Sequence, residues 1–416
     1  MNRASHLINQ FFKFLSAVSL TAILIVELAP SARASDSEDV LAACAAFASN
    51  GGWVTATTNA ANLSAEITDP AGSVSRLSLP LVDPATENEP ANARVNSCRA
   101  YFDRDSDLIA IGVSYGLRRR YSLRIGVADA KESKWIGKWT VGPASGTYQP
   151  FLLGFLEGTQ SVVVGGGPST PTKYGPGMRH GSFESLLFNP QGQQLPSTPT
   201  MRDYGSDSDP FPFYADASHN RLWFFRCVVV SAPLPRQPDC PVGWMTLVGD
   251  SSTSSEFNPR RSGEKRTDFW MSPGTFAAPD GSTVAVAETV AGLNTIWLAD
   301  VQKQTLNRLT LPKRLHFPNS EEIHGAAALS PDGEVAVFPL VKEAVAFPYL
   351  MDNYDYKGTD FAAVQLHPLR LLAILPGAGP KSFGACAVDH RQGHVAVLVF
   401  RENHWEHVEL KVPPSS

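Results

Sequence analysis

Short apolar runs separated by tight polar turns dominate this 416-residue chain. The clearest case is residues 326–338, where two apolar runs flank the turn Ser330-Pro331-Asp332-Gly333. Runs of this length predict β-strands, and a Pro-Asp-Gly turn between them predicts an antiparallel hairpin. The rest of the chain is therefore searched for the same strand–turn–strand pattern.

Six further segments repeat the pattern, roughly every 55 residues. A third apolar run, and often a fourth, follows most of the hairpins, as at 295–299 and 305–311. Four short strands per unit, repeated around a ring, make a β-propeller, in which each unit needs neighbours to bury its faces. The residues at the seven turns are Asn50, Asp103, Glu157, Asp216, Asp280, Asp332 and Asp389.

The sequence thus predicts an all-β protein with one propeller of seven four-stranded blades, six or eight blades being the alternatives. The last unit offers only three strands, at 383–388, 395–400 and 405–412. A strand from within residues 39–47 is expected to complete it. Each turn aspartate is expected to cap its own turn through backbone amides, and not to act as a catalytic acid.

Two of the units resemble the repeats of TolB-type or WD-repeat-like propellers. The signature of those repeats is an apolar strand, Ser-Pro-Asp-Gly and a second apolar strand, and residues 278–287 and 329–337 carry it. The Trp-Asp pair of true WD repeats does not occur in these units. The resemblance implies a propeller fold and leaves the activity open, because one fold hosts many functions.

Composition agrees with an all-β chain and narrows the partners. The 32 Gly and 32 Pro residues supply turn positions, and 43% hydrophobic residues supply a large core. Charged residues make up 18% of the chain and the net charge is −5. This balance argues against nucleic acid or an anionic membrane surface as the partner.

The N-terminal segment has the pattern of a secretory signal. Arg3 and Lys13 are basic, residues 14–26 are apolar, and Ala32-Arg33-Ala34 offers a cleavage site. The apolar run is shorter than the roughly 20 residues that a spanning helix needs. We expect cleavage of residues 1–34, a propeller domain at 35–416, and an extracytoplasmic protein, periplasmic or secreted, with no membrane span in the mature chain.

Five cysteines suit an oxidising compartment. Cys227 and Cys240 flank a proline-rich segment and are expected to form one disulfide. Cys44 could pair with Cys98 or with Cys386, and we favour Cys98 because the two cysteines lie at a similar depth before their turns. No Cys-x-x-Cys spacing occurs, so no zinc site is expected.

Long segments between the strands are predicted to lie on one face of the ring. Those after second strands are 165–181, 231–241 and 342–360, and those between units are 195–212, 249–273 and 312–325. In a propeller both kinds of connection emerge on the same side, whereas the hairpin turns lie on the other. Concentrated insertions mark a binding face.

The chemistry available on that face suggests a ligand without defining one. Aromatic rings and carboxylates suit a sugar or a peptide, and acids near an imidazole could serve as general acid and base. The spacings match neither a phosphate-binding glycine loop nor a calcium loop, so no cofactor or metal is expected. His404 and His407, three apart on a predicted strand, should point to opposite faces. The candidate binding residues are Tyr174, His180, Glu321, Glu322, His324, Tyr354 and Asp355.

The resulting prediction is a non-catalytic, monomeric propeller that binds a protein, peptide or glycan on this face. The alternative is a carbohydrate-active lyase or glycosidase that uses carboxylates and histidines near the central channel. No catalytic residue is assigned. A Gly-x-Ser-x-Gly elbow is missing from the sequence, which disfavours a propeller peptidase.

Overall fold

A computed structural model of the full chain gives the fold. The structure describes part of the chain. The described residues are 41–59, 61–81, 94–117, 120–145, 150–165, 185–196, 210–226, 242–249, 254–257, 276–277, 283–290, 293–300, 303, 305–312, 315–316, 327–342, 359–377 and 384–411.

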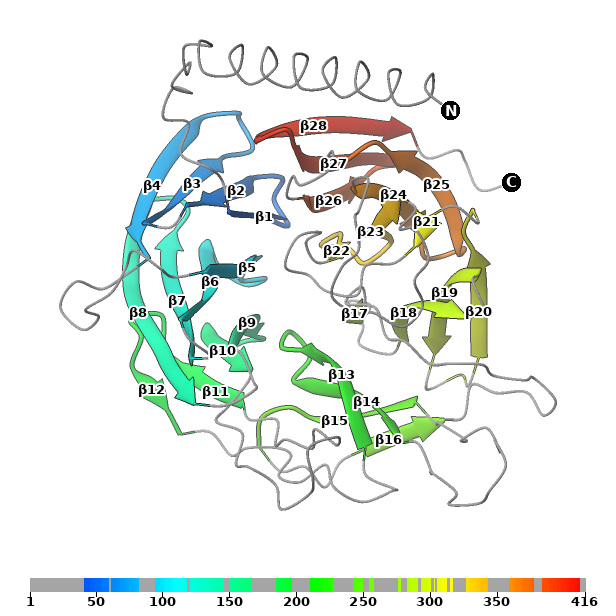
Figure 1. The fold of residues 1–416 in the computed structure, drawn as a ribbon, viewed down its shortest axis with the longest axis horizontal. Helices are drawn as coiled ribbons and strands as arrows, with labels where there is room; N and C mark the ends of the chain where they lie inside the picture. The colour runs from blue at the N-terminus through cyan, green and yellow to red at the C-terminus, as the bar shows by residue number, and fades with distance from the viewer. Residues whose placement is uncertain are drawn as a thin grey trace, which may run out of the picture. The chain divides into compact units, whose positions relative to one another are not determined.

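The described elements are β-strands, and they pair into antiparallel sheets in chain order (Figure 1). The first three sheets contain β1 (Ala42–Phe47), β2 (Trp53–Thr58), β3 (Asn62–Thr68) and β4 (Val74–Pro80); β5 (Arg94–Phe102), β6 (Leu108–Leu117), β7 (Arg120–Asp129) and β8 (Lys134–Ser145); and β9 (Phe151–Leu156), β10 (Ser161–Gly165), β11 (Ser185–Phe188) and β12 (Gln194–Leu195).

The next two sheets also have four strands each. They contain β13 (Pro210–Asp216), β14 (Arg221–Arg226), β15 (Val242–Thr246) and β16 (Ser254–Phe257); and β17 (Phe276–Ala277), β18 (Thr283–Val290), β19 (Leu293–Asp300) and β20 (Thr305–Thr310).

The last two sheets depart from four strands. One has five, and the other has three. They contain β21 (Leu315–His316), β22 (Ala328–Leu329), β23 (Val335–Lys342), β24 (Thr359–Gln365) and β25 (Arg370–Leu375); and β26 (Ala385–Arg391), β27 (His394–Arg401) and β28 (His404–Lys411).

These sheets form a single β-propeller, as the sequence predicts. First strands are in contact from β1 through β5, β9 and β13 to β17, and the fifth and sixth sheets share one hydrophobic cluster. β26 contacts both β22 and β1, so the last sheet meets the first. The prediction of seven four-stranded blades was wrong in detail, because six sheets have four or five described strands and the sheet β26–β28 has three. The closing strand expected within 39–47 was also wrong. Residues Ala42–Phe47 form β1, which pairs with β2 as the inner strand of the first sheet.

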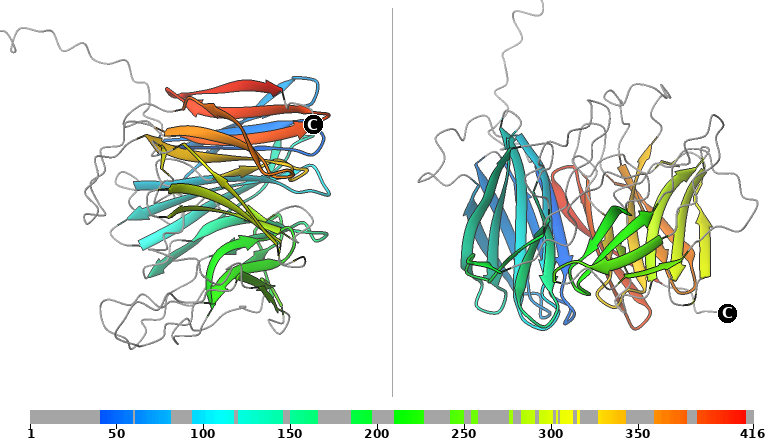
Figure 2. Two further views of the ribbon diagram at one scale, coloured as in Figure 1. Left: turned by 90° about the vertical axis from the view of Figure 1, so that its right-hand side faces the viewer. Right: turned by 90° about the horizontal axis from the view of Figure 1, so that it is seen from below.

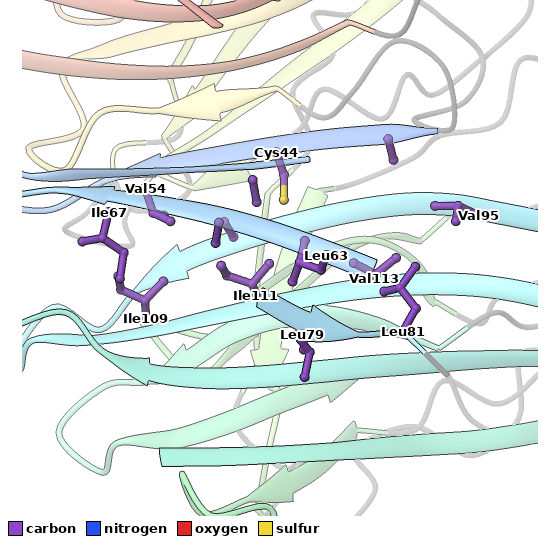
Figure 3. Close-up of a cluster of buried hydrophobic side chains, with 14 residues drawn as sticks. Cys44, Val54, Leu63, Ile67, Leu79, Leu81, Val95, Ile109, Ile111 and Val113 are labelled. Carbon is purple, nitrogen blue, oxygen red and sulfur yellow. The ribbon is translucent and has the colours of Figure 1, made fainter. Parts of the chain in front are cut away.

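Burial explains why strand composition changes from the centre outwards. A strand covered on both faces can be apolar throughout, as in β10, where all five residues are buried. An outer strand alternates, and in β4 Leu79 is buried whereas Arg76 and Ser78 are exposed. The hydrophobic core therefore lies between neighbouring sheets. Figure 3 shows one such layer, in which Ile67 of the first sheet meets Ile109 of the second.

The hairpin at 328–338 has the predicted geometry. Leu329 pairs with Ala336, and the backbone N–H of Gly333 donates to the carbonyl of Ser330 at 2.8 Å. Gly333 has a φ of 75°, a left-handed conformation that glycine adopts without steric cost. The glycine of the Pro-Asp-Gly turn is therefore explained by the left-handed backbone conformation that the turn requires.

One disulfide joins the first two sheets, between Cys44 of β1 and Cys98 of β5, with Cα atoms 5.3 Å apart. This confirms the favoured pairing and excludes Cys44–Cys386. Cys386 is a buried thiol outside this disulfide, and burial raises its pKa to about 12. The predicted Cys227–Cys240 pair lies outside the described residues.

Removing the disulfide should destabilise the propeller strongly. The two cysteines are 54 residues apart, and the loss of such a cross-link costs about 4 kcal/mol in the chain-entropy treatment. The variant Cys44→Ala/Cys98→Ala should therefore unfold at lower urea than the oxidised wild type, measured by tryptophan fluorescence. Reduced wild-type protein should shift in the same direction. Identical midpoints for oxidised wild type and the variant would contradict this.

Candidate functional site

The seven predicted binding residues all fall in parts of the chain that are not described. Tyr174, His180, Glu321, Glu322, His324, Tyr354 and Asp355 lie within 166–184, 317–326 and 343–358. Whether any of them converge is therefore still a prediction. The structure does place the strand ends that lead into these segments.

Those strand ends are on the side of the ring away from the hairpin turns. The pair Gly165 and Ser185 flanks the segment 166–184, and the pair Val341 and Thr359 flanks 342–358. Because the strands of each sheet are antiparallel, these ends are opposite the turns that join first to second strands. In the right-hand view of Figure 2 the hairpin turns are at the bottom of the sheets.

Connections between second and third strands differ sharply in length around the ring. They are long in three sheets, at 166–184, 227–241 and 343–358. In the last sheet Arg401 pairs with His404, and Glu402 and Asn403 have φ values of 51° and 62°. Two consecutive positive φ values define a type I′ turn, which is the shortest way to make this connection. The longer connections thus go beyond what joining the strands requires.

The best-described group of ionisable residues lies on the hairpin-turn side instead. We call it the seam cluster, and it consists of Asp332 from the β22–β23 turn and Asp389, His390 and Arg391 from the end of β26. His390 Nδ1 is 2.7 Å from Asp332 Oδ2, which links the last two sheets. Arg391 Nη2 donates to the carbonyl of Ala48 at 2.7 Å, which links the last sheet to the first.

Charge and burial make these contacts specific. The Asp389 carboxylate accepts from Arg391 Nε at 2.9 Å, and this holds the guanidinium towards Ala48. Burial raises the pKa of Asp389, the Arg391 charge opposes that rise, and the nearby Asp332 carboxylate adds to it. The cluster therefore contains two carboxylates that repel each other, and each has its own cationic or imidazole partner.

The cluster resembles a catalytic triad in composition and differs from one in connectivity. Ser330 Oγ donates to Asp332 Oδ1 at 2.6 Å, and Asp332 lies between the serine and His390. A base can activate a serine only by accepting its proton, so the histidine would have to be the central residue. Ser330 also accepts from the backbone N–H of Val335 at 3.0 Å. This arrangement fits a turn that is held to its neighbour.

Turn residues of other sheets have similar structural roles. Asn50 Oδ1 accepts from the N–H of Gly52 at 2.9 Å, Asp332 Oδ1 accepts from that of Glu334 at 3.1 Å, and Asp216 is 2.6 Å from His219 Nδ1. Capping through backbone amides is therefore confirmed for Asp216 and Asp332, whereas Asp103 accepts from the Ser106 hydroxyl and Asp389 from the Arg391 side chain. Within the described ranges, no group of three or more His, Cys, Asp or Glu side chains could hold a metal ion.

Sequence reasoning missed His390 and Arg391. It identified Asp389 as a turn residue, but nothing local indicates that the next two side chains reach different sheets. Arg391 and Ala48 are 343 positions apart. His404 and His407 do lie on a strand, β28, and His407 stacks on Trp53 with ring centroids 5.7 Å apart.

Gly51 should be required at the seam. It has a φ of 100°, and a Cβ there would overlap the Arg391 guanidinium. Gly51→Ala should lower the free energy of unfolding by at least about 2 kcal/mol, through backbone strain and loss of the Ala48 contact. Gly72→Ala is the control, because Gly72 has a φ of 86° with no neighbour within 4 Å. It should cost only about 1 kcal/mol, and equal losses in urea titrations would refute the seam role.

Asp389 should make stability fall as pH rises. The unfolded chain releases this proton near pH 3.8 and the folded chain at a higher pH, so the folded state binds more protons in between. The unfolding free energy of wild type minus that of Asp389→Asn should decrease as pH rises above 3.8.

Asp69 provides an internal comparison of opposite sign. Backbone N–H donors, first that of Ser73, lower its pKa, so its stabilising effect should appear above pH 3.8 and be lost on acidification. The difference between wild type and Asp69→Asn should therefore increase with pH. Urea titrations from pH 3 to 6 would measure both, and slopes of the same sign would contradict the assignment.

Comparison with known proteins gives no family. No protein-family model matches the sequence, and no curated protein matches it. Solved structures that resemble the chain include hydrazine synthase from Kuenenia stuttgartiensis, with 10% identity, a TM-score of 0.46 and coverage of 93% of this chain and 99% of that one.

Two others are a protease's β-propeller domain and TolB. The β-propeller domain of the trilobed protease from Pyrococcus furiosus has 10% identity, a TM-score of 0.42 and coverage of 89% and 94%. TolB from Acinetobacter baumannii has 12% identity, a TM-score of 0.34 and coverage of 84% and 76%. At these identities the likeness concerns the fold alone. The agreement with TolB-type and WD-repeat-like propellers at the level of fold rests on the chain's own ring of antiparallel sheets.

Proposed function

We propose that the protein is an exported, non-catalytic propeller that binds a protein, peptide or glycan on the face opposite its hairpin turns. One observation carries the proposal: the second-to-third-strand connections are long in three sheets and as short as a two-residue turn in another. Loops that are not needed to join strands are where rigid scaffolds carry binding residues. The three sheets that bear them are the third, fourth and sixth along the chain.

Export is part of the proposal. The basic and apolar pattern of residues 1–34 supports it, as does the Cys44–Cys98 disulfide, because such bonds persist in oxidising compartments. No helix in the described part of the chain is long and apolar enough to cross a membrane. A monomer with a mature N-terminus at Ser35 follows from this proposal.

The described ionisable groups do not favour the enzymatic alternative. The seam cluster is engaged in contacts between sheets, and its serine is bonded to an aspartate. The residues on which a carbohydrate-active enzyme would depend lie outside the described ranges. The non-catalytic reading is therefore the one we propose.

A loop replacement tests the binding face. Residues 166–184 would be replaced by Asn-Gly, which can join Gly165 to Ser185 as a two-residue hairpin. The exported wild type, expected to begin at Ser35, should retain a ligand on a glycan array or in a pull-down. The replacement variant should lose at least tenfold in affinity while keeping its urea midpoint, because the strands on both sides stay paired.

The control is Asp107→Ala on the hairpin-turn face, which should bind as wild type does. Equal binding by wild type and loop variant would exclude this segment from the site. Retention of no ligand by the wild type on either assay would refute the binding proposal.

A further inference from the structure

In the described part of the chain, the sheet β26–β28 ends one strand short of its neighbours. Its outermost strand, β28, pairs with β27 along His404–Lys411, and no described strand pairs with its other edge. The adjacent sheets continue to a fourth strand, β4 on one side and β25 on the other (Figure 1). Strands in a sheet are about 4.8 Å apart, so the free edge of β28 is recessed by about that distance between the two neighbours.

One wall of this recess is the face of the first sheet that is turned away from the second. Residues that are aligned across antiparallel strands have side chains on the same face of the sheet. Trp53 stacks on His407 of β28 and is therefore on this face. Trp53 is aligned with Thr68, and Thr68 with Val74, so Val74 is on the same face. Val74 is 57% exposed and is the only large hydrophobic side chain classed as exposed within the described ranges. It lies on the part of the wall that a fourth strand beside β28 would cover.

The rest of this wall is polar and open. Ser64, Arg76 and Ser78 are exposed, and the Arg76 side chain is 81% exposed although it pairs with Glu66 at 2.7 Å. On the opposite face of the same strands, Leu63 and Leu79 are fully buried against the second sheet. The two faces differ because the second sheet has a fourth strand, β8, whereas the sheet β26–β28 has three described strands.

The other wall is apolar. Leu372 of β25 is only partly buried, and it packs in one cluster with Val408 and Leu410 of β28. A strand placed beside β28 would therefore meet apolar side chains on one face and polar ones on the other. Its side chains would have to alternate in the same way, because successive residues of a strand point to opposite faces.

From this we infer that the free edge of β28 is a docking site for an extended segment of another protein, with alternating apolar and polar residues. Pairing would be by β-strand addition, in which main-chain hydrogen bonds give affinity and the flanking walls select the side chains. The recess is one strand wide, which excludes a second copy of this chain as the occupant through the same edge. The β28 of that copy would be recessed as well, so the two edges could not meet.

The inference is tested with two synthetic octapeptides, one alternating Val and Glu and the other alternating Val and Lys. Binding should slow hydrogen exchange of the β28 amides and leave the outer strands of the four-stranded sheets unchanged. Arg76→Glu should weaken the Val/Glu peptide and strengthen the Val/Lys peptide, each by roughly two- to fivefold, as for exposed ion pairs. Both changes in peptide affinity should appear without any change in the folding of the variant.

The matched control is Lys134→Glu, the same charge change at the start of β8, an outermost strand in a four-stranded sheet. It should leave both affinities as in wild type. The inference fails if neither peptide protects β28, if protection appears equally on other outer strands, or if Lys134→Glu has the same effect as Arg76→Glu. It also fails if the edge of β28 is already as protected as β27 in the free protein, because the chain then fills the position itself.

Discussion

The structure depends on one constraint, which is that each sheet must bury both of its faces against neighbours. A single four-stranded sheet with a strand such as β10, apolar on both faces, cannot be stable in water. Neighbouring sheets solve this for each other, and the solution is complete only if the last sheet also meets the first. Every local feature of the chain is compatible with an open row of sheets, so closure requires contacts of its own.

Those contacts are concentrated between the last sheet and the first, which are not consecutive in the chain. Consecutive sheets are tethered by the chain itself, whereas β26 and β1 are held together only by side-chain and packing contacts. Phe47 packs with Trp53 and Trp405 there, and Arg391 reaches the carbonyl of Ala48. The Cys44–Cys98 bond then ties β1 to the next sheet. Apolar packing and the Arg391 hydrogen bond thus close the ring, and the disulfide fixes the first sheet to the second.

The difference between local contacts and contacts far apart in the chain explains what could be predicted from the sequence. The hairpin at Asp332 and the all-β repeat were predictable because they follow from residues within about ten positions of each other. The Cys44–Cys98 pair was predictable because equivalent positions in neighbouring repeats are adjacent in space. The role of Arg391 was not, because its partner is a backbone carbonyl 343 residues away and carries no side-chain signal.

The misassigned strand has a similar cause. Residues 42–47 are small and apolar, AACAAF, which predicts a strand without saying which sheet it joins. An outer strand alternates buried and exposed residues, as β4 does, so this apolar run fits an inner strand better. The choice was made by Cys44, whose partner on β5 requires β1 to be an inner strand beside the second sheet.

The polar wall beside β28 is a consequence of β1 lying in the first sheet, because the last sheet then has three described strands. If a fourth strand always covered that wall, Ser64, Glu66, Arg76 and Ser78 would be costly there, because buried polar groups need partners. The same strands have Leu63, Ile67 and Leu79 on the face that is permanently covered. A surface that must be stable when open and can still be covered has to be mostly polar, with a few apolar positions such as Val74. The residues of β3 and β4 therefore fit a wall that is stable when exposed to water, and a segment that docked on it could leave again without destabilising the ring.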